Sequence, residues 1–201
     1  MDENNQIISI KSKKYNYLFD TSTILYFQTL YEHSGASIFE ALKECNDVNF
    51  FVITDVLSEL LQGNKGLTPL HLKIFFDHIL NSECSMDPNW KENRFLVMEN
   101  NEVKYIVLNK ISPIDYAQVL ICQNHKELIL VTNDKKMLKS AAQVIKDRRV
   151  LGIPALLDKL IFLYPNNQRL KILKETGDNI FIKKHAFGNI SEKKFNEIYK
   201  K

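Results

Sequence analysis

Short runs of aliphatic and aromatic residues alternate along this sequence with segments that have helical spacing. The clearest run is Leu128 to Val131, which is purely aliphatic and is bounded by polar residues. Continuous apolar runs are typical of strands buried on both faces, as in a parallel sheet covered by helices. Crossovers in such a sheet are right-handed, and its functional groups lie outside the carboxyl ends of the strands. The pattern therefore predicts a three-layer α/β/α fold.

The individual elements follow from this alternation. Thr54, Thr68-Pro69 and Ser112-Pro113 are start signals, because each supplies an N-cap residue or a proline for the first turn of a helix. We expect further strands at 17–19, 50–53 and 149–151. We expect helices at 21–30, 54–61, 68–80, 112–124, 135–145 and 154–163.

Two regions interrupt the alternation. Residues 81–110 contain two apolar stretches separated by Glu99-Asn100-Asn101-Glu102, which predicts an inserted β-hairpin. After Pro165, residues 166–176 and 191–200 each have helical spacing. We therefore expect one domain at 1–164 that includes the 81–110 insertion, followed by a basic, helical C-terminal extension at 165–201.

Four acidic residues stand where a parallel sheet carries its functional groups. Asp20 follows the first strand, Asp134 closes the fourth, Asp115 lies in the first turn after Ser112, and Glu59 lies in the helix after the second strand. Four converging carboxylates would repel one another in a partly buried site, and a bound cation removes that repulsion. Oxygen ligands favour Mg²⁺ or Mn²⁺ over zinc, and such an ion can activate water against a phosphodiester.

Each of the three aspartates also has a purely structural explanation. Asp20 and Asp134 could cap the helices that follow them, and Asp115 could complement a helix dipole. Asp55 competes with Glu59, because it lies one turn earlier on the same helical face. The ordered set at strand ends favours a catalytic metal site over four unrelated structural residues.

The motifs around these acids resemble those of PIN domains. Leu18 to Leu25 is similar to the opening motif, Val52 to Leu60 to the second, and Asp115 with 130–134 to the third and fourth acidic positions. The resemblance covers about residues 15–160 and implies a five-stranded parallel sheet in the order 3-2-1-4-5. It implies ribonuclease activity that depends on Mg²⁺ or Mn²⁺, with supporting hydrogen bonds from Ser22 and Thr132. Many bacterial members are toxins paired with an antitoxin, but this chain is longer than a compact toxin.

Charge is distributed unevenly along the chain. Residues 1–134 carry 11 Lys/Arg against 18 Asp/Glu, whereas residues 135–201 carry 16 against 6. This distribution suits an enzyme that binds metal at one place and a polyanion nearby, although a solvated lysine-rich surface explains it equally well. The candidate RNA contacts are Lys135, Lys136, Arg148, Arg149, Lys183 and Lys184.

The N-terminus, the apolar stretches and the cysteines indicate where in the cell the protein is found. The N-terminus is polar and acidic, unlike a secretory signal, and the best apolar stretch, 156–164, is interrupted by Asp158 and Lys159. The 3 cysteines include no Cys-x-x-Cys pair, so we expect neither a disulfide framework nor a zinc site. These features predict a cytoplasmic protein without a membrane segment.

The favoured function is a divalent-metal-dependent endoribonuclease, either a toxin of a toxin–antitoxin pair or an RNA-processing nuclease. Its catalytic residues would be Asp20, Glu59, Asp115 and Asp134, and its partners RNA and an antitoxin or other protein, with a homodimer left open. The alternative is an inactive PIN-like module that binds RNA or a protein. A phosphatase of the haloacid dehalogenase type is disfavoured, because its second Asp is replaced by Ser22.

Overall fold

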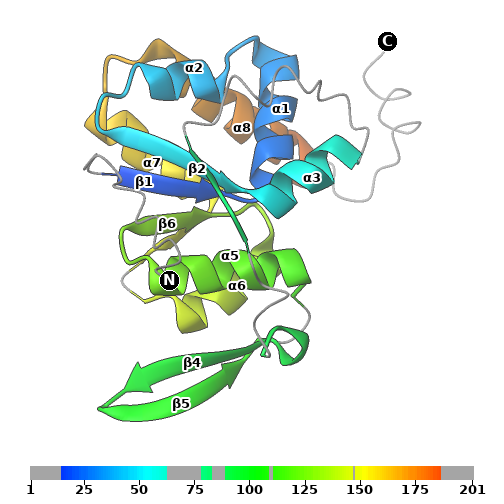
Figure 1. Cartoon of the computed structure of the whole chain (residues 1–201). Coiled ribbons are helices and arrows are strands. Elements are labelled where there is room, and N and C mark those ends of the chain that lie inside the picture. Colours follow the sequence, from blue (N-terminus) through cyan, green and yellow to red (C-terminus); the bar gives the residue numbers. More distant parts are fainter. Residues whose placement is uncertain (1–14, 63–77, 83–88, 109–110, 147, 187–201) are drawn as a thin grey trace, which may run out of the picture.

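Five strands form a parallel sheet in the order β3-β2-β1-β6-β7 (Figure 1). The computed structural model describes residues 15–62, 78–82, 89–108, 111–146 and 148–186. Counted along the chain, the sheet strands have the expected order 3-2-1-4-5, and the α/β fold class is confirmed. The strands are β1 (Tyr15–Phe19), β2 (Val48–Ile53), β3 (His78–Leu80), β6 (Leu128–Val131) and β7 (Val150–Leu151).

Helices cover both faces of this sheet. Helix α8 packs against α1, α2 and α7 on one face, while α5 and α6 pack together on the other (Figure 1). The apolar strand residues lie between these layers, and every residue of β2 is buried. The helices are α1 (Thr21–Ser34), α2 (Ile38–Lys43), α3 (Thr54–Gln62), α5 (Pro113–Asn124), α6 (Lys135–Val144), α7 (Ile153–Leu163) and α8 (Gln168–Ala186).

Most predicted elements are present, with bounds that differ by a few residues. The exception is the helix expected at 68–80, because residues 78–80 form strand β3 instead. His78, Ile79 and Leu80 pair in parallel with Phe51, Val52 and Ile53, so pairing with β2 decides their conformation. Residues 68–77 lie outside the described part of the chain, as does the helix expected at 191–200. The short helix α2 was not predicted.

The predicted hairpin is confirmed as β4 (Arg94–Glu99) and β5 (Glu102–Val107), an antiparallel pair that follows the short 3₁₀ turn η2 (Trp90–Glu92). It projects from the α5 side of the molecule (Figure 1). Its inner face is anchored by Phe95, which is buried and whose ring centroid lies 4.5 Å from that of Tyr116 on α5. The helix after Pro165 is also confirmed, but it runs to Ala186 rather than ending at 176.

Candidate functional site

Asp20 lies at the carboxyl end of β1 and is the N-cap of α1. Its side chain is almost fully buried, with a relative exposure of 4%. The carboxylate accepts hydrogen bonds from the Thr23 amide at 2.7 Å, the Ser22 hydroxyl at 2.8 Å and the Thr132 hydroxyl at 2.6 Å. Burial raises the pKa of Asp20, and the hydrogen bonds from Thr132, Thr23 and Ser22 oppose that rise. The carboxylate is thus held in one orientation by three donors.

Asp134 follows the neighbouring strand and caps α6. One of its oxygens, Oδ1, accepts from the amides of Lys136 and Met137 at 2.6 and 3.2 Å. Strands β1 and β6 are adjacent in register, with Phe19 beside Val131, so the two acids belong to one edge of the sheet. Asp134 itself is exposed.

The hydroxyls of Thr132 and Ser22 connect Asp20 to the turn that carries Asp134. Thr132 is buried, and its hydroxyl donates to Asp20 while accepting from the Asp134 amide at 3.0 Å. The Ser22 hydroxyl donates to Asp20 and accepts from the Asn133 amide at 3.0 Å. Each hydroxyl therefore ties the start of α1 to the turn between β6 and α6.

Asp115 approaches the same edge from α5. It forms a capping box with Ser112, in which the Asp115 amide donates to Ser112 Oγ at 3.0 Å and the Ser112 amide donates to Asp115 Oδ2 at 3.1 Å. Burial raises the pKa of Asp115, the Ser112 hydrogen bonds oppose the rise, and the charges of Asp20 and Asp134 add to it. The structure therefore brings Asp115 within electrostatic reach of both other aspartates.

Glu59 is linked to the other acids through Thr21 at the start of α1. It is exposed on α3, and its Oε2 accepts a hydrogen bond from the Thr21 hydroxyl at 2.5 Å. Thr21 begins α1 directly after Asp20, so one helix start positions both acids. The sequence analysis did not select Thr21, although this residue stands between Asp20 and Ser22 in the opening motif from Leu18 to Leu25. The competitor Asp55 lies in the first turn of α3.

The oxygen-only donor set suits a hard divalent cation. In the described part of the chain, no three His, Cys, Asp or Glu side chains form a group that could hold an ion by themselves. Asp115 Oδ1 and Asp134 Oδ2 nevertheless accept no hydrogen bond from the described residues. Mg²⁺ commonly keeps several waters and uses one or two carboxylates, so the residues fit a partly hydrated ion better than a closed cage.

The basic residues that were predicted to contact RNA do not lie on one surface. Lys135 and Lys136 are exposed in the first turn of α6, beside Asp134. Arg148 and Arg149 precede β7 and so lie at the opposite, amino edge of the parallel sheet. There Arg149 donates from one guanidinium nitrogen to the carbonyls of Cys122, His125 and Leu128, and the structure does not bring it to the acids. Residues 183 and 184 belong to α8, but their side chains lie outside the described atoms.

No protein-family model and no curated protein matches this sequence. Among solved structures, the structure of the PIN domain endonuclease Utp24 is similar over 70% of this chain and 86% of that chain, with 15% sequence identity and a TM-score of 0.42. None of the helices in the described ranges combines the length and the apolar character needed to cross a membrane.

Proposed function

We propose that this chain is a PIN-like endoribonuclease that hydrolyses RNA phosphodiester bonds with the help of Mg²⁺ or Mn²⁺. The observation that carries the proposal is the hydrogen-bonded link from the Asp20 carboxylate through Thr132 to the Asp134 backbone amide, with Asp115 near enough for the charges of both acids to act on it. The buried Thr132 hydroxyl joins the Asp20 carboxylate to the backbone amide of Asp134, a contact that neither helix cap requires. Asp20, Asp115, Asp134 and Glu59 are the proposed metal-binding and catalytic residues.

The chain's own groups prepare this edge for a negatively charged substrate. Helices α1, α5 and α6 all begin here, at Asp20, Ser112 and Asp134, and helix N-termini carry partial positive charge. That charge offsets part of the repulsion among the carboxylates and favours binding of a phosphate. Lys135 and Lys136 add full positive charges at the start of α6.

Within the site, the acids have different tasks. Asp115 and Asp134 would each offer the ion an oxygen that accepts no hydrogen bond from a described residue, while Asp20 would offer a carboxylate whose orientation is fixed by three donors. When bound, a divalent ion would stabilise charge on the phosphate and lower the pKa of a water. Glu59, exposed and oriented by Thr21, would orient the attacking water or hold a second ion.

The test is cleavage of a mixed pool of single-stranded and structured RNA by the purified protein. We expect cleavage with Mn²⁺ or Mg²⁺ and none with EDTA, and we expect Asp134→Asn to be inactive. Cleavage that continues in EDTA would contradict the metal mechanism. Either a toxin that is inhibited by an antitoxin or an RNA-processing nuclease could use this reaction. Expression of a toxin would arrest cell growth, and co-expression of a neighbouring gene product would relieve that arrest.

A second candidate function is a PIN-like module that binds RNA or a protein without cleaving RNA. It is favoured by the fact that no three acids in the described ranges form a metal-binding group and that three of the acids serve as helix caps or in a capping box. RNA bound with equal affinity by the wild type and Asp134→Asn, without cleavage by either, would support this function. For either function we propose a cytoplasmic location, which suits the buried free thiols of Cys45 and Cys122.

A further inference from the structure

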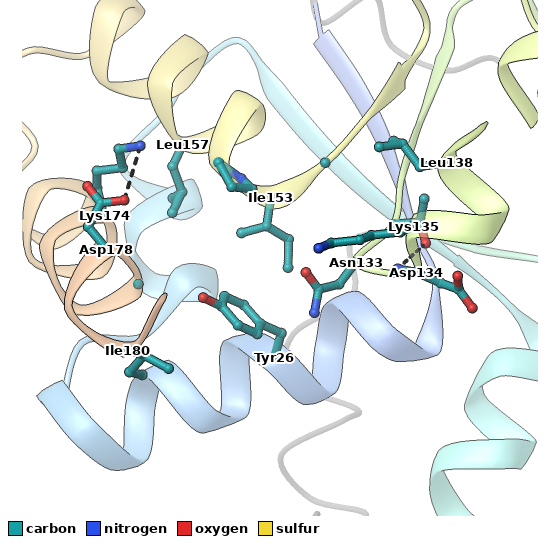
Figure 2. A pocket seen from close by; sticks show the side chains of 14 residues that line it. Tyr26, Asn133, Asp134, Lys135, Leu138, Ile153, Leu157, Lys174, Asp178 and Ile180 are labelled. Atoms are coloured by element: carbon teal, nitrogen blue, oxygen red, sulfur yellow. Dashed lines mark hydrogen bonds and ion pairs between the residues drawn. The ribbon is translucent and has the colours of Figure 1, made fainter. Parts of the chain in front are cut away.

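A pocket of about 760 Å³ adjoins the acidic site on the side of α1, α7 and α8 (Figure 2). Its volume falls within the range of roughly 300–1,000 Å³ that is usual for small-molecule sites. Thr132, Asn133 and Asp134 form the wall that it shares with the acidic site. A strand of RNA held at the acids would therefore pass its mouth.

The far walls of the pocket are apolar and aromatic. They include Ile153 and Leu157 of α7, Ile180 of α8 and Tyr26 of α1, and Figure 2 shows Tyr26 and Ile153 facing one another. Ile153 and Leu157 are buried, whereas Tyr26 is only half-buried, which leaves part of its ring available. Aromatic and apolar walls of this kind suit the flat, weakly polar face of a nucleobase.

The polar groups of the pocket stand on the side of the acids. Asn133 and Lys135 reach from the start of α6 toward Tyr26 and Ile153 (Figure 2). Lys174 also lines the pocket, but its ammonium is paired with Asp158 at 3.1 Å and Asp178 at 3.5 Å. Lys135 forms no ion pair with a described residue, so its ammonium group is available beside the acidic site.

We propose that this pocket binds one nucleotide of the RNA strand, next to the phosphate that is cut, and so contributes to sequence preference. This inference rests on the proposed function, because it is the acidic site that brings the strand to the mouth of the pocket. The base lies between Tyr26 and Ile153, the Asn133 amide offers a donor and an acceptor to the base edge, and Lys135 contacts the adjoining phosphate. A nucleotide fits better than an apolar ligand, because only the former uses the cation and the amide at the mouth.

Gly177 of α8 allows the pocket to be filled without disturbing the core. A β-carbon at this position would lie 3.4 Å from the Tyr26 hydroxyl and 3.9 Å from Leu30 Cδ2, which is ordinary van der Waals contact. Glycine is also unfavourable inside a helix relative to other residues, so a substitution here need not destabilise α8. The longer side chain of Gly177→Leu would then occupy the pocket itself.

The test measures the affinity of a fluorescent single-stranded RNA in EDTA by anisotropy, with the four nucleoside monophosphates as competitors. Tyr26→Ala should weaken RNA binding roughly 5- to 150-fold, the usual range for one stacked base, and Tyr26→Phe should weaken it less. Gly177→Leu should weaken RNA binding and abolish competition by the monophosphates. Tyr31→Ala, which removes an exposed ring from the same helix outside the pocket, is the matched control and should bind as the wild type does.

The two proposals fail in different ways. Equal RNA affinity of the wild type, Tyr26→Ala and Gly177→Leu would overturn the pocket inference, and so would a wild type that binds no RNA in EDTA. Metal-dependent cleavage by the wild type would leave the proposed function intact in either case. If Tyr26→Ala is unfolded in thermal melts, Gly177→Leu decides the question.

Discussion

Thr132 links two elements of the candidate site through one side chain. Its hydroxyl is buried, donates to Asp20 at 2.6 Å and accepts from the Asp134 amide at 3.0 Å. A hydroxyl that is satisfied as donor and as acceptor in a dry environment allows little rotation of its partners. A single side chain therefore connects the Asp20 carboxylate to the backbone at Asp134, although the two acids come from different elements.

Replacing this threonine by valine keeps the shape but removes both hydrogen bonds. Because the Asp20 oxygen and the Asp134 amide then lose a partner, Thr132→Val should lower the free energy of unfolding by about 1–3 kcal/mol. The rate of RNA cleavage should also fall, because the hydroxyl no longer links Asp20 to the Asp134 amide. Urea unfolding and cleavage assays measure the two effects.

Thr132→Ser is the control for this experiment, because it keeps the hydroxyl and loses only a methyl group. We expect it to keep most of the cleavage activity and to be destabilised by about 1 kcal/mol, the typical effect of one buried methylene-sized group. If the serine and valine variants are alike in stability and in cleavage, the hydroxyl does not organise the site.

At the scale of elements, three helix starts share one edge of the sheet. Helices α1, α5 and α6 each begin with a side-chain cap, supplied by Asp20, Ser112 and Asp134. Capping and the proposed metal binding are compatible, because Asp134 caps α6 through Oδ1 alone. The acids therefore stabilise their helices whether or not an ion is bound.

The hairpin β4–β5 has two faces with different roles in stability. On the inner face Phe95 is 1% exposed and packs on Tyr116, whereas on the outer face Met98 is 60% exposed. Phe95→Ala should lower the free energy of unfolding by about 3–5 kcal/mol, the usual effect of emptying a buried aromatic site. Met98→Ala on the same strand should change it by less than about 0.5 kcal/mol. Urea unfolding that gives similar values for the two variants would show that the hairpin does not dock on α5.

At the scale of the whole molecule, the acidic site couples stability to pH. Burial raises the pKa of Asp115, with the charges of Asp20 and Asp134 adding to the rise. Because the folded-state pKa exceeds the ordinary value of 3.8, the stability that Asp115 contributes is fully present below pH 3.8. It is lost as the pH rises through the raised pKa.

Asp115→Asn cannot ionise, and its side-chain oxygen can still accept the hydrogen bond from the Ser112 amide. In EDTA, we expect its stability relative to the wild type to increase as the pH rises from about 3 to 7. At pH 7 the variant should be no less stable than the wild type. Thermal melts across this pH range measure the difference, and a constant difference at every pH would contradict the proposed origin of the raised pKa.

Bound metal should reverse the order of stability, so that the wild type becomes more stable than Asp115→Asn. An ion at a free concentration 100-fold above its dissociation constant adds about 2.7 kcal/mol to the stability of the folded state. For a chain of this size that is roughly 5–10 °C in Tm, and the increase should be larger for the wild type than for Asp115→Asn. Glu32→Gln, a change at an exposed acid of α1, is the control and should respond to Mn²⁺ as the wild type does. Equal responses in all three proteins would show that Asp115 is not a ligand.

Local sequence determined the interior strands and the helix starts. Residues 50–53 and 128–131 form strands where they were expected, because an unbroken apolar run is stable only when both of its faces are buried. Ser112 and Pro113 begin α5 as predicted, since capping and proline geometry depend on neighbouring residues alone. The hydrogen bonds from Ser22 and Thr132 to Asp20 could likewise be anticipated from the resemblance to PIN domains.

Tertiary structure decided the features that depend on distant partners. Residues 78–80 become the edge strand β3 because β2 offers them a free edge, which their own helix-compatible sequence does not reveal. Arg149 is held by three carbonyls from the end of α5 and the start of β6, so its position is set by chain segments more than 20 residues away.

The pocket beside Asp134 exists only because α8 packs against α1 and α7, and its walls come from four helices. Periodicity and capping are short-range properties that can be read along the chain, whereas strand edges and pockets arise from packing between segments that the sequence does not place side by side.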